Sequence, residues 1–497
     1  MKYNNPVIKG FYPDPSVCKV DDTYYLVCSS FQYFPGVPLF ESKDLINWNQ
    51  IGHCLTRKSQ VQLEDINSSG GVFAPTIRYN NGRFYMTTTN NTTNQNFYVW
   101  TDDIYGEWSD PIFVDQGGID PSLYFEDNKT YFMSTEGDVK GVNGIYQCEI
   151  DIETGRRLTE SKVIWQGSGG RYLESPHLYK INGNYYLMVA EGGTEYGHMV
   201  TYARSNSPYG PFEAYPSNPV LTNRNLGGYE IQGVGHGDLI EDNSGNWWML
   251  HLGFRQIDKW SMFHHLGREV FLTEVTFHED GWFTAGYNGT TLNSVETDRI
   301  SDEVIQLEKK CYTFENTEWE KDWCYLRHPN SDNYVMEKNS VKLKGTEVTL
   351  DKPASPTFIG IRQMDFNAVI SCDVSVTEGE AGITLYMDEN HHYDLAVRKA
   401  HNGFEVIERL NIGDVKSIEN IIAIQNNSAS LVIRPNNNYY SFYIKSEEKE
   451  ILLGTAKTRY LSTEVACGFT GVIIGLYACG EKCASYAQFT NFKCEYI

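Results

Sequence analysis

The sequence has 497 residues, enough for two or more domains with separate cores, and it combines 14% aromatic residues with 43 glycines. Helical apolar periodicity is hard to find, so the composition favours an all-β protein. The formal net charge of −23 opposes binding to nucleic acids or anionic membranes, which leaves a neutral ligand as the natural alternative.

The N-terminal stretch, MKYNNPVIKGFYP, lacks the apolar core of a secretory signal. No apolar run approaches the roughly eighteen residues that a membrane-spanning helix needs. The eleven cysteines are scattered from Cys18 to Cys494, and this odd number is typical of reduced thiols rather than of a disulfide framework. Together these features predict a cytoplasmic protein.

Five segments share one form, in which a polar turn precedes an aromatic pair and a short apolar strand. Turns such as Asn-Gly supply the positive φ angles of a β-hairpin, and aromatic residues favour the following strand. Five such units of about fifty residues predict a five-bladed β-propeller. A long irregular β-sandwich is the alternative, but it would not explain five matched hairpins. The pairs are Tyr24 and Tyr25, Phe84 and Tyr85, Tyr131 and Phe132, Tyr185 and Tyr186, and Trp247 and Trp248.

A second repeated element precedes each aromatic pair by about ten residues. It is a proline that opens a short apolar strand, replaced by a glycine in the fifth copy. In a propeller the inner strands of all blades surround one axis, so the residue before each proline or glycine is expected at the mouth of that axis. These positions hold Asp14, Ala74 (preceded by Phe73), Asp120, the pair Glu174 and Ser175, and His236.

This register would bring three carboxyl groups together, those of Asp14, Asp120 and Glu174. Like charges at one mouth raise the pKa of at least one carboxyl group. One carboxyl kept protonated as an acid and one ionised as a base are the machinery of glycoside hydrolysis. Each residue alone could be a turn, capping or surface ion-pair residue, but their shared register favours a catalytic site.

Seven segments between about residues 4 and 290 match the motifs of a known enzyme family in their order and spacing. They are GFYPDPS, GGVFAPTIRY, GGIDPSLYFED, RYLESPHLYK, AEGGTEYGH, GVGHGDL and HHLGREV. The chain resembles glycoside hydrolase family 43, and most of all its two-domain β-xylosidases and α-L-arabinofuranosidases. The resemblance implies a five-bladed propeller and inversion at the anomeric carbon. It implies Asp14 as general base, Glu174 as general acid, and Asp120 as the residue that orients Glu174 and tunes its pKa.

The resemblance also implies residues that bind the terminal sugar. Phe31 and Phe73 match aromatic walls of the sugar pocket, with ordinary core aromatics as the alternative, although many relatives carry Trp in place of Phe73. Arg268 matches an arginine that hydrogen-bonds the sugar, with an ordinary ion pair to Glu269 as the alternative. Ala74 is expected at the same mouth, and Thr194, with Glu191, is expected to support the pocket.

His236 matches a family histidine at the axis, where similar enzymes often bind a calcium or sodium ion. It is therefore a candidate for contact with the substrate or with such an ion, and a satisfied structural histidine is the alternative. No other cofactor is implied, because acid–base hydrolysis needs none.

The repeat stops after Thr290, and the charged segment SVETDRISDEVIQLEKK is typical of a linker. We expect a propeller domain over residues 1–300 and a second domain over 311–497, where alternating strands and turns predict a β-sandwich. By itself the sandwich could be a carbohydrate-binding module. The resemblance instead implies that it lends a loop to the pocket, and GFTGVIIG, with Phe469 reaching the substrate, is the segment we expect there.

The leading hypothesis is an exo-acting, inverting enzyme that releases terminal α-L-arabinofuranose, with β-D-xylose as a second product, from arabinose- and xylose-containing oligosaccharides. A predominant β-D-xylosidase is the runner-up. A non-catalytic carbohydrate-binding propeller belongs to another class, and a protein-binding scaffold is more distant. The sequence leaves open the natural oligosaccharide and whether the chain forms a homo-oligomer.

Overall fold

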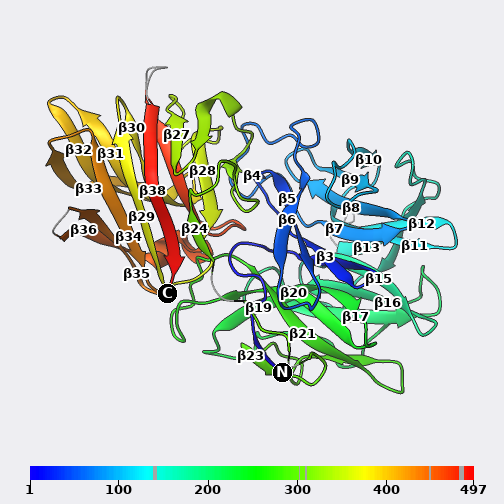
Figure 1. The fold of residues 1–497 in the computed structure, drawn as a ribbon. Coiled ribbons are helices and arrows are strands. Elements are labelled where there is room, and N and C mark those ends of the chain that lie inside the picture. Colours follow the sequence, from blue (N-terminus) through cyan, green and yellow to red (C-terminus); the bar gives the residue numbers. More distant parts are fainter. Residues whose placement is uncertain (138–142, 302, 308–309, 447–448, 481–485) are drawn as a thin grey trace.

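The computed structural model describes residues 1–497 except 138–142, 302, 308–309, 447–448 and 481–485 (Figure 1). The described chain is almost entirely β and forms two bodies, an N-terminal propeller and a C-terminal sandwich, side by side. The all-β class, the five-bladed propeller and the following β-sandwich predicted from the sequence are confirmed.

Five antiparallel sheets of four strands each make the blades. Blade 1 contains β2 (Ser16–Val20), β3 (Thr23–Val27), β5 (Gly36–Ser42) and β6 (Asn49–Leu55). Blade 2 contains β7 (Thr76–Asn80), β8 (Arg83–Asn90), β9 (Gln95–Thr101) and β10 (Ile112–Val114). Blade 3 contains β11 (Ile119–Glu126), β12 (Lys129–Gly137), β13 (Asn143–Ile150) and β14 (Lys162–Trp165). Blade 4 contains β15 (Glu174–Ile181), β16 (Asn184–Glu191), β17 (Met199–Ser205) and β18 (Glu213–Ala214). Blade 5 contains β19 (Ile231–Glu241), β20 (Trp247–Arg255), β21 (Glu269–Phe277) and β22 (Phe283–Ala285).

Each aromatic pair lies on the second strand of its blade, as the hairpin repeat predicted. One ring of each pair packs between neighbouring blades: Tyr25 contacts Phe84 with ring centroids 5.2 Å apart, and Tyr124 contacts Tyr185 at 6.4 Å. Such edge-on aromatic contacts add stability beyond the burial of apolar area. The repeated pair therefore joins the blades as well as marking the strand.

The residue that precedes each inner-strand proline or glycine has a special backbone in four blades. Asp14, Asp120, Ser175 and His236 adopt φ angles of 58°, 53°, 56° and 47°. In blades 3, 4 and 5 the pairing of the first two strands shifts at this point, as in a β-bulge. A bulge re-aims a side chain at the end of a strand, and non-glycine residues at positive φ persist only where the surroundings enforce them.

The C-terminal domain is a sandwich of two sheets around one apolar core. One sheet orders β26 (Tyr334–Glu337), β27 (Ser340–Lys344), β38 (Tyr486–Tyr496), β29 (Ala368–Val376), β34 (Ser428–Pro435), β35 (Tyr439–Lys445) and β36 (Glu450–Lys457), with β24 (Cys311–Thr313) beside β38. The other sheet, called the inner sheet below, orders β28 (Thr357–Arg362), β37 (Ile473–Cys479), β30 (Glu380–Asp388), β31 (His391–Ala400), β32 (Gly403–Ile412) and β33 (Val415–Ile424).

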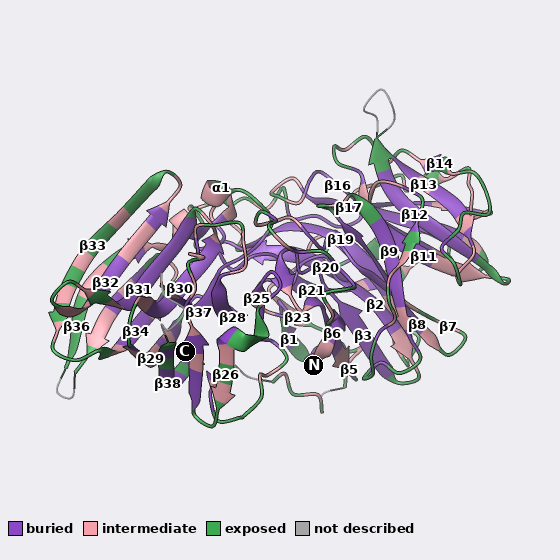
Figure 2. Cartoon of the chain, turned by 90° about the horizontal axis from the view of Figure 1, so that it is seen from above, coloured by how far each residue is buried: buried purple, intermediate pink, exposed green. Residues whose placement is uncertain are grey.

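The inner sheet turns toward the propeller, and β28 and β37 lie nearest to it (Figure 2). Phe358, Tyr386 and Tyr477 of this sheet share one apolar cluster with Phe31 and Tyr33 of the propeller. A short pairing of β4 (Tyr33–Phe34) with β25 (Tyr325–Leu326) also joins the two bodies. The interface is thus a continuous core, which fixes the sandwich against the propeller.

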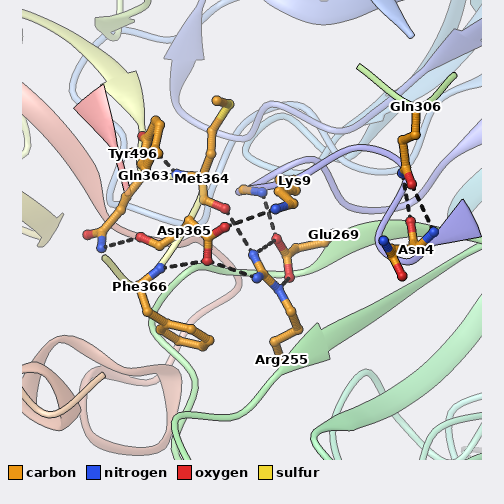
Figure 3. A network of polar contacts seen from close by, with 11 residues as sticks. Asn4, Lys9, Arg255, Glu269, Gln306, Gln363, Met364, Asp365, Phe366 and Tyr496 are labelled. Carbon is orange, nitrogen blue, oxygen red and sulfur yellow. Dashed lines mark hydrogen bonds and ion pairs between the residues drawn. The ribbon is translucent and has the colours of Figure 1, made fainter. Parts of the chain in front are cut away.

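Polar contacts complete this interface (Figure 3). Asp365 of the sandwich forms ion pairs with Lys9 at 2.9 Å and with Arg255 at 3.1 Å. Arg255 in turn holds Glu269 at 2.8 Å, so the ion pair that the sequence suggested for Arg268 and Glu269 is made by Arg255 instead. Arg268 is left available for other contacts. Gln306 of the segment between the domains exchanges two hydrogen bonds with the backbone of Asn4 (Figure 3).

None of the ten cysteines within the described residues forms a disulfide. In the same part of the chain, no helix is both long and apolar enough to cross a membrane. The helical elements there are short, and α1 (Thr463–Ala466) is a single turn near the loop that carries Phe469.

Candidate active site

The inner ends of the blades bring the predicted residues to one place. We call this place the mouth, defined by Asp14, Asp120, Glu174 and His236. The Nδ1 atom of His236 lies 3.6 Å from a carboxylate oxygen of Asp14 and 4.0 Å from one of Asp120. The backbone N–H of Ser175 donates to Asp120 at 3.1 Å, which joins blade 4 to blade 3 beside Glu174. Residues more than 200 positions apart thus meet as the repeat predicted.

Asp14 is buried and is held from two sides. Its Oδ1 accepts a hydrogen bond from Arg268 Nη1 at 2.8 Å, and its Oδ2 accepts one from the Ser29 hydroxyl at 2.5 Å. Burial raises the pKa of Asp14, but the charges of Arg268 and His236 and the hydrogen bond from Ser29 outweigh it. The pKa of Asp14 therefore lies below its ordinary value, and this carboxylate is ionised at neutral pH.

Glu174 has the opposite character. Burial and the charge of Asp14 raise the pKa of Glu174 to about 7, against the opposing charge of Arg268. Burial and the charges of Glu174 and Asp14 also raise the pKa of Asp120 well above its ordinary value. Since Asp14 is ionised, its charge favours the protonated form of both neighbours, and about half of Glu174 is protonated at neutral pH. The mouth therefore holds an ionised carboxylate, Asp14, and a carboxyl group that carries a transferable proton, Glu174, as acid–base catalysis requires.

Three phenylalanine rings form one wall beside Asp14 and Arg268. Phe31 contacts Phe73 with ring centroids 5.3 Å apart, and Phe469 from the sandwich stacks on Phe31 at 5.9 Å and meets Phe73 edge-on at 6.0 Å. The Phe469 side chain remains partly exposed, with 40% of its surface accessible. The predicted loop thus reaches the predicted wall, in which Phe31 is buried as part of the apolar cluster between the domains, and Ala74, the residue after Phe73, is buried as well.

The Phe469 loop is anchored through its backbone. Its N–H donates to the Ser69 hydroxyl at 2.8 Å, and its carbonyl oxygen accepts from Arg268 Nη2 at 3.2 Å. At Gly471 a Cβ atom would lie 2.5 Å from the carbonyl oxygen of Leu266. A side chain there would push the loop away from the segment that leads to Arg268. The sandwich therefore contributes a fixed wall to the mouth.

Thr194 and Glu191 support the mouth in different ways. The Thr194 hydroxyl accepts a second hydrogen bond from Arg268 Nη1, at 2.9 Å, and so helps to fix the guanidinium that faces Asp14. Glu191 is fully buried and accepts from the backbone N–H groups of Ser168 at 2.8 Å and Gly170 at 2.5 Å. Glu191 thereby braces the loop that leads into Glu174.

His236 is buried at the centre of the mouth. Burial and the charge of Arg268 lower its pKa below the ordinary value, against the opposing effect of Asp14. Within the described residues, no group of three or more histidine, cysteine, aspartate or glutamate side chains is arranged to hold a metal ion. A calcium or sodium ion near His236 therefore stays a prediction.

A buried ion pair between the inner strands was not predicted from the sequence. Arg78 binds Asp238 at 2.8 Å, and its Nη2 lies 2.9 Å from His177 Nδ1. Asp238 also accepts from the hydroxyl groups of Ser16 and Tyr179, so one carboxylate ties blades 1, 2, 4 and 5 together at the axis. A signal was present, because Arg78 and Asp238 each lie two to four residues beyond an axial position of the repeat.

Two family models match the chain in consecutive segments. Residues 3–283 match the model described as "Glycosyl hydrolases family 43", which covers more than half of the chain. Residues 311–495 match the model described as "Beta xylosidase C-terminal Concanavalin A-like domain".

Characterised relatives match over nearly the whole length. The chain is 38% identical to the non-reducing end α-L-arabinofuranosidase BoGH43B of Bacteroides ovatus, over 99% of this chain and 95% of the relative. It is 37% identical to a xylosidase/arabinosidase of Butyrivibrio fibrisolvens, over 99% of both chains. Among solved structures, the one titled Bacteroides ovatus Xyloglucan PUL GH43B superposes with a TM-score of 0.93 at 36% identity, and all of both chains are covered.

Proposed function

The chain belongs to glycoside hydrolase family 43, and on that premise we propose that it is an exo-acting, inverting glycosidase that releases terminal α-L-arabinofuranose and, as a second product, β-D-xylose. One observation carries the proposal. Three carboxyl groups converge at the mouth, and their surroundings lower the pKa of Asp14 but raise that of Glu174 to about 7.

Asp14 is the general base in this proposal. Its carboxylate takes a proton from a water molecule, which attacks the anomeric carbon of the terminal sugar from the face opposite the leaving group. Inversion needs space for that water, so we expect the carboxyl groups of Asp14 and Glu174 to stand about 6.5–9.5 Å apart. Arg268 and Ser29 keep Asp14 ionised and oriented for this step.

Glu174 is the general acid. A pKa of about 7 leaves a large fraction of Glu174 protonated at neutral pH, and the proton goes to the glycosidic oxygen as the bond to the anomeric carbon breaks. Asp120 is a positioning residue, because it accepts the N–H of Ser175, the residue next to Glu174. The charge of Glu174 also raises the pKa of Asp120, so the protonation of one carboxyl group affects that of the other.

The aromatic wall supports exo action on short oligosaccharides. Phe31, Phe73 and the Phe469 ring lent by the sandwich close one side of the mouth. We infer that a single terminal sugar, held by Arg268 and covered by these rings, occupies the mouth while the remainder of the oligosaccharide extends outward. Arabinose- and xylose-containing oligosaccharides are the substrates proposed, because relatives over the whole chain are named arabinofuranosidase and xylosidase/arabinosidase.

The test compares nitrophenyl glycosides with unactivated disaccharides and follows the anomeric proton of the first product by NMR. We expect hydrolysis of the nitrophenyl α-L-arabinofuranoside with inversion. Glu174→Ala should slow the unactivated substrate at least about a hundredfold more than the nitrophenyl glycoside, since only a poor leaving group needs a proton. Equal losses on both substrates would assign the acid role to another residue, and binding without any turnover would favour a non-catalytic carbohydrate-binding propeller.

A further inference from the structure

A half-exposed tyrosine borders the mouth on the side of the general acid. Tyr172 lies two residues before Glu174 and keeps 54% of its surface accessible. Its ring packs on the loop that joins β16 to β17, because a Cβ atom on Gly193 would lie 2.9 Å from Tyr172 Cδ2. The next residue of that loop is Thr194, whose hydroxyl group binds Arg268 at the mouth. The Tyr172 ring therefore lies at the edge of the mouth.

The backbone of Tyr172 has an uncommon conformation. Its φ angle is 52°, in the left-handed region that bulky residues rarely adopt. The Arg171 carbonyl oxygen accepts from the Gly192 N–H at 2.7 Å, and Arg171 Nε donates to the Gly192 carbonyl oxygen at 3.0 Å. On the other side of Tyr172, the Leu173 carbonyl oxygen accepts from the Thr135 hydroxyl group. Both neighbours are thus fixed, and strain that is enforced in this way is a feature of binding and catalytic sites.

The ring itself is also supported. Gly193 has a φ of 81° and leaves the space beside the ring that any other residue would fill. The Arg171 guanidinium lies 5.3 Å from the centroid of the Tyr172 ring and forms an ion pair with Glu195. We call Arg171, Tyr172, Gly193 and Glu195 the acid-side rim. Its aromatic ring is held in place while more than half of the side chain remains free for contact.

The chemistry of the mouth determines what lies beside this rim. A general acid must reach the glycosidic oxygen within hydrogen-bond distance. The sugar on the far side of the scissile bond therefore lies next to Glu174, whose side chain is partly accessible. The terminal sugar lies on the other side of that bond, beside the wall that contains Phe31 and Phe469. Because the acid-side rim begins two residues from Glu174, it is adjacent to the leaving sugar.

The rim suits a neutral pyranose ring. The face of a pyranose presents C–H groups, and an aromatic ring offers them a flat apolar surface. The hydroxyl groups at the edge of the sugar both donate and accept, and the rim provides N–H donors on Arg171 and carboxylate acceptors on Glu195. These two charges are paired with each other, and both side chains are more than half exposed. Apolar contact with a few orienting polar groups is the usual composition of a small-molecule site.

We propose that Tyr172 is the platform for the leaving sugar and that the acid-side rim selects substrates whose leaving group is a pyranose. In the oligosaccharides proposed above, this unit is xylopyranose. Tyr172 binds the leaving sugar and takes no part in proton transfer. The inference rests on the proposed function, since the role of Glu174 as acid determines on which side the leaving group lies.

The experiment compares two substrates that share a terminal sugar and both need the acid. One is a disaccharide of α-L-arabinofuranose on xylose, and the other is methyl α-L-arabinofuranoside, which has no leaving sugar. Tyr172→Asn removes the ring but keeps a residue type that tolerates positive φ. We expect kcat/KM to fall at least about tenfold on the disaccharide, the scale of one lost contact, and to stay within about twofold on the methyl glycoside.

Two further variants sharpen the result. Tyr172→Phe keeps the ring and should retain kcat/KM on the disaccharide within about twofold. Tyr105→Asn changes a tyrosine that is 65% exposed in the loop after β9 of blade 2, and it should affect neither substrate. Equal losses on both substrates with Tyr172→Asn would give Tyr172 a purely structural role and overturn the proposal, as would an unchanged kcat/KM on the disaccharide. A wild-type chain that hydrolyses neither substrate would reject the proposed function, and this inference with it.

Discussion

The mouth of the propeller and a cleft on the inner sheet of the sandwich, lined by Glu380, His392 and Arg409, both hold clustered charged side chains, but the surroundings shift the pKa values of their carboxyl groups in different directions. The mouth sets three carboxyl groups against Arg268, and the pKa of Glu174 rises to about 7. In the cleft, burial raises the pKa of Asp394 but the charges of His392 and Arg409 outweigh it, and the pKa falls below its ordinary value. A carboxyl group crowded by like charge keeps a proton available for transfer, whereas a carboxylate held by a buried cation stays ionised.

This comparison also separates stability from catalysis. A carboxyl group whose pKa is raised by folding destabilises the folded chain at neutral pH, whereas one whose pKa is lowered stabilises it. The mouth is therefore expected to be a site where the fold gives up stability, and the cleft a site where it gains stability. Substitutions of the raised and the lowered carboxyl groups should therefore change the free energy of unfolding in opposite directions.

The largest effect is expected at Asp14. Asp14→Asn removes the base but keeps a residue type that tolerates a φ of 58°. Turnover should fall at least about a hundredfold, the usual scale for a general base, with the fold retained. The matched control is Asp21→Asn, which changes an exposed aspartate at a φ of 53° in the same blade and should keep normal turnover. Near-normal turnover of a folded Asp14→Asn chain would remove Asp14 from the mechanism.

A matched pair of substitutions tests the difference in stability. At pH 8, Glu174→Gln should raise the free energy of unfolding by at most about 3 kcal/mol, because the pKa of Glu174 is raised from 4.5 to about 7. The gain should vanish below about pH 4.5, where the carboxyl group is protonated in both states. Asp394→Asn should instead lower the free energy of unfolding by about 1–3 kcal/mol, since it weakens buried hydrogen bonds to charged groups.

The pKa of Asp394 is lowered by folding, so its contribution is present above its unfolded pKa of about 4 and is lost as pH falls through the folded value. Urea unfolding at pH 8 and pH 4 measures both variants. Destabilisation by Glu174→Gln at pH 8, or stabilisation by Asp394→Asn, would contradict the contrast between the two regions.

The next effect concerns Arg268, whose charge lowers the pKa of both Asp14 and Glu174. In Arg268→Met both pKa values should rise. The acidic limb of kcat/KM, set by ionisation of Asp14, and the alkaline limb, set by protonation of Glu174, should then both move to higher pH. The profile is measured on an unactivated alkyl glycoside, which needs the acid. Arg83→Met, which removes a cation that stacks on Trp100 in blade 2, should leave both limbs in place.

Features of the structure that are set by residues close together in the sequence could be predicted, whereas features set by contacts between distant segments could not. The aromatic hairpins and the residues before Pro15, Pro121 and Pro176 are local signals that recur, so the blades and the convergence of carboxyl groups followed from the chain alone. The propeller topology then supplied the long-range contacts. The place of Phe469 came only from the resemblance, because no repeat connects the sandwich loop to the mouth.

The cleft was not predicted because its residues belong to strands without an internal repeat. Glu380 and Tyr477 have apolar neighbours in their strands, and Arg409 lies between Glu408 and Leu410, so the pattern of residues does not tell which face turns to the propeller. The Arg78–Asp238 pair was missed for a different reason. Its residues lie within the repeat but two to four positions beyond the axial residues, where the register alone does not show which side chains meet.

The smallest effect is expected for the choice between the two pentoses. Terminal arabinofuranose and xylopyranose present similar hydroxyl groups to one acid–base pair, so the walls of the mouth must select between them. One changed contact there is worth about 1–3 kcal/mol, or about tenfold to two-hundredfold. Phe73 contacts both Phe31 and Phe469, and it replaces the Trp expected in many similar enzymes.

We therefore expect kcat/KM on the nitrophenyl α-L-arabinofuranoside to exceed that on the β-D-xylopyranoside. Phe73→Trp should shift this ratio toward the xylopyranoside by about tenfold, because a larger ring narrows the wall that Phe469 completes. Phe113→Trp, at an exposed position in blade 2, is the control and should leave the ratio unchanged. A wild-type preference of about tenfold or more for the xylopyranoside would reverse the assignment of the main sugar. The roles of Asp14 and Glu174 would stand, because they depend on the carboxyl groups of the mouth and not on its wall.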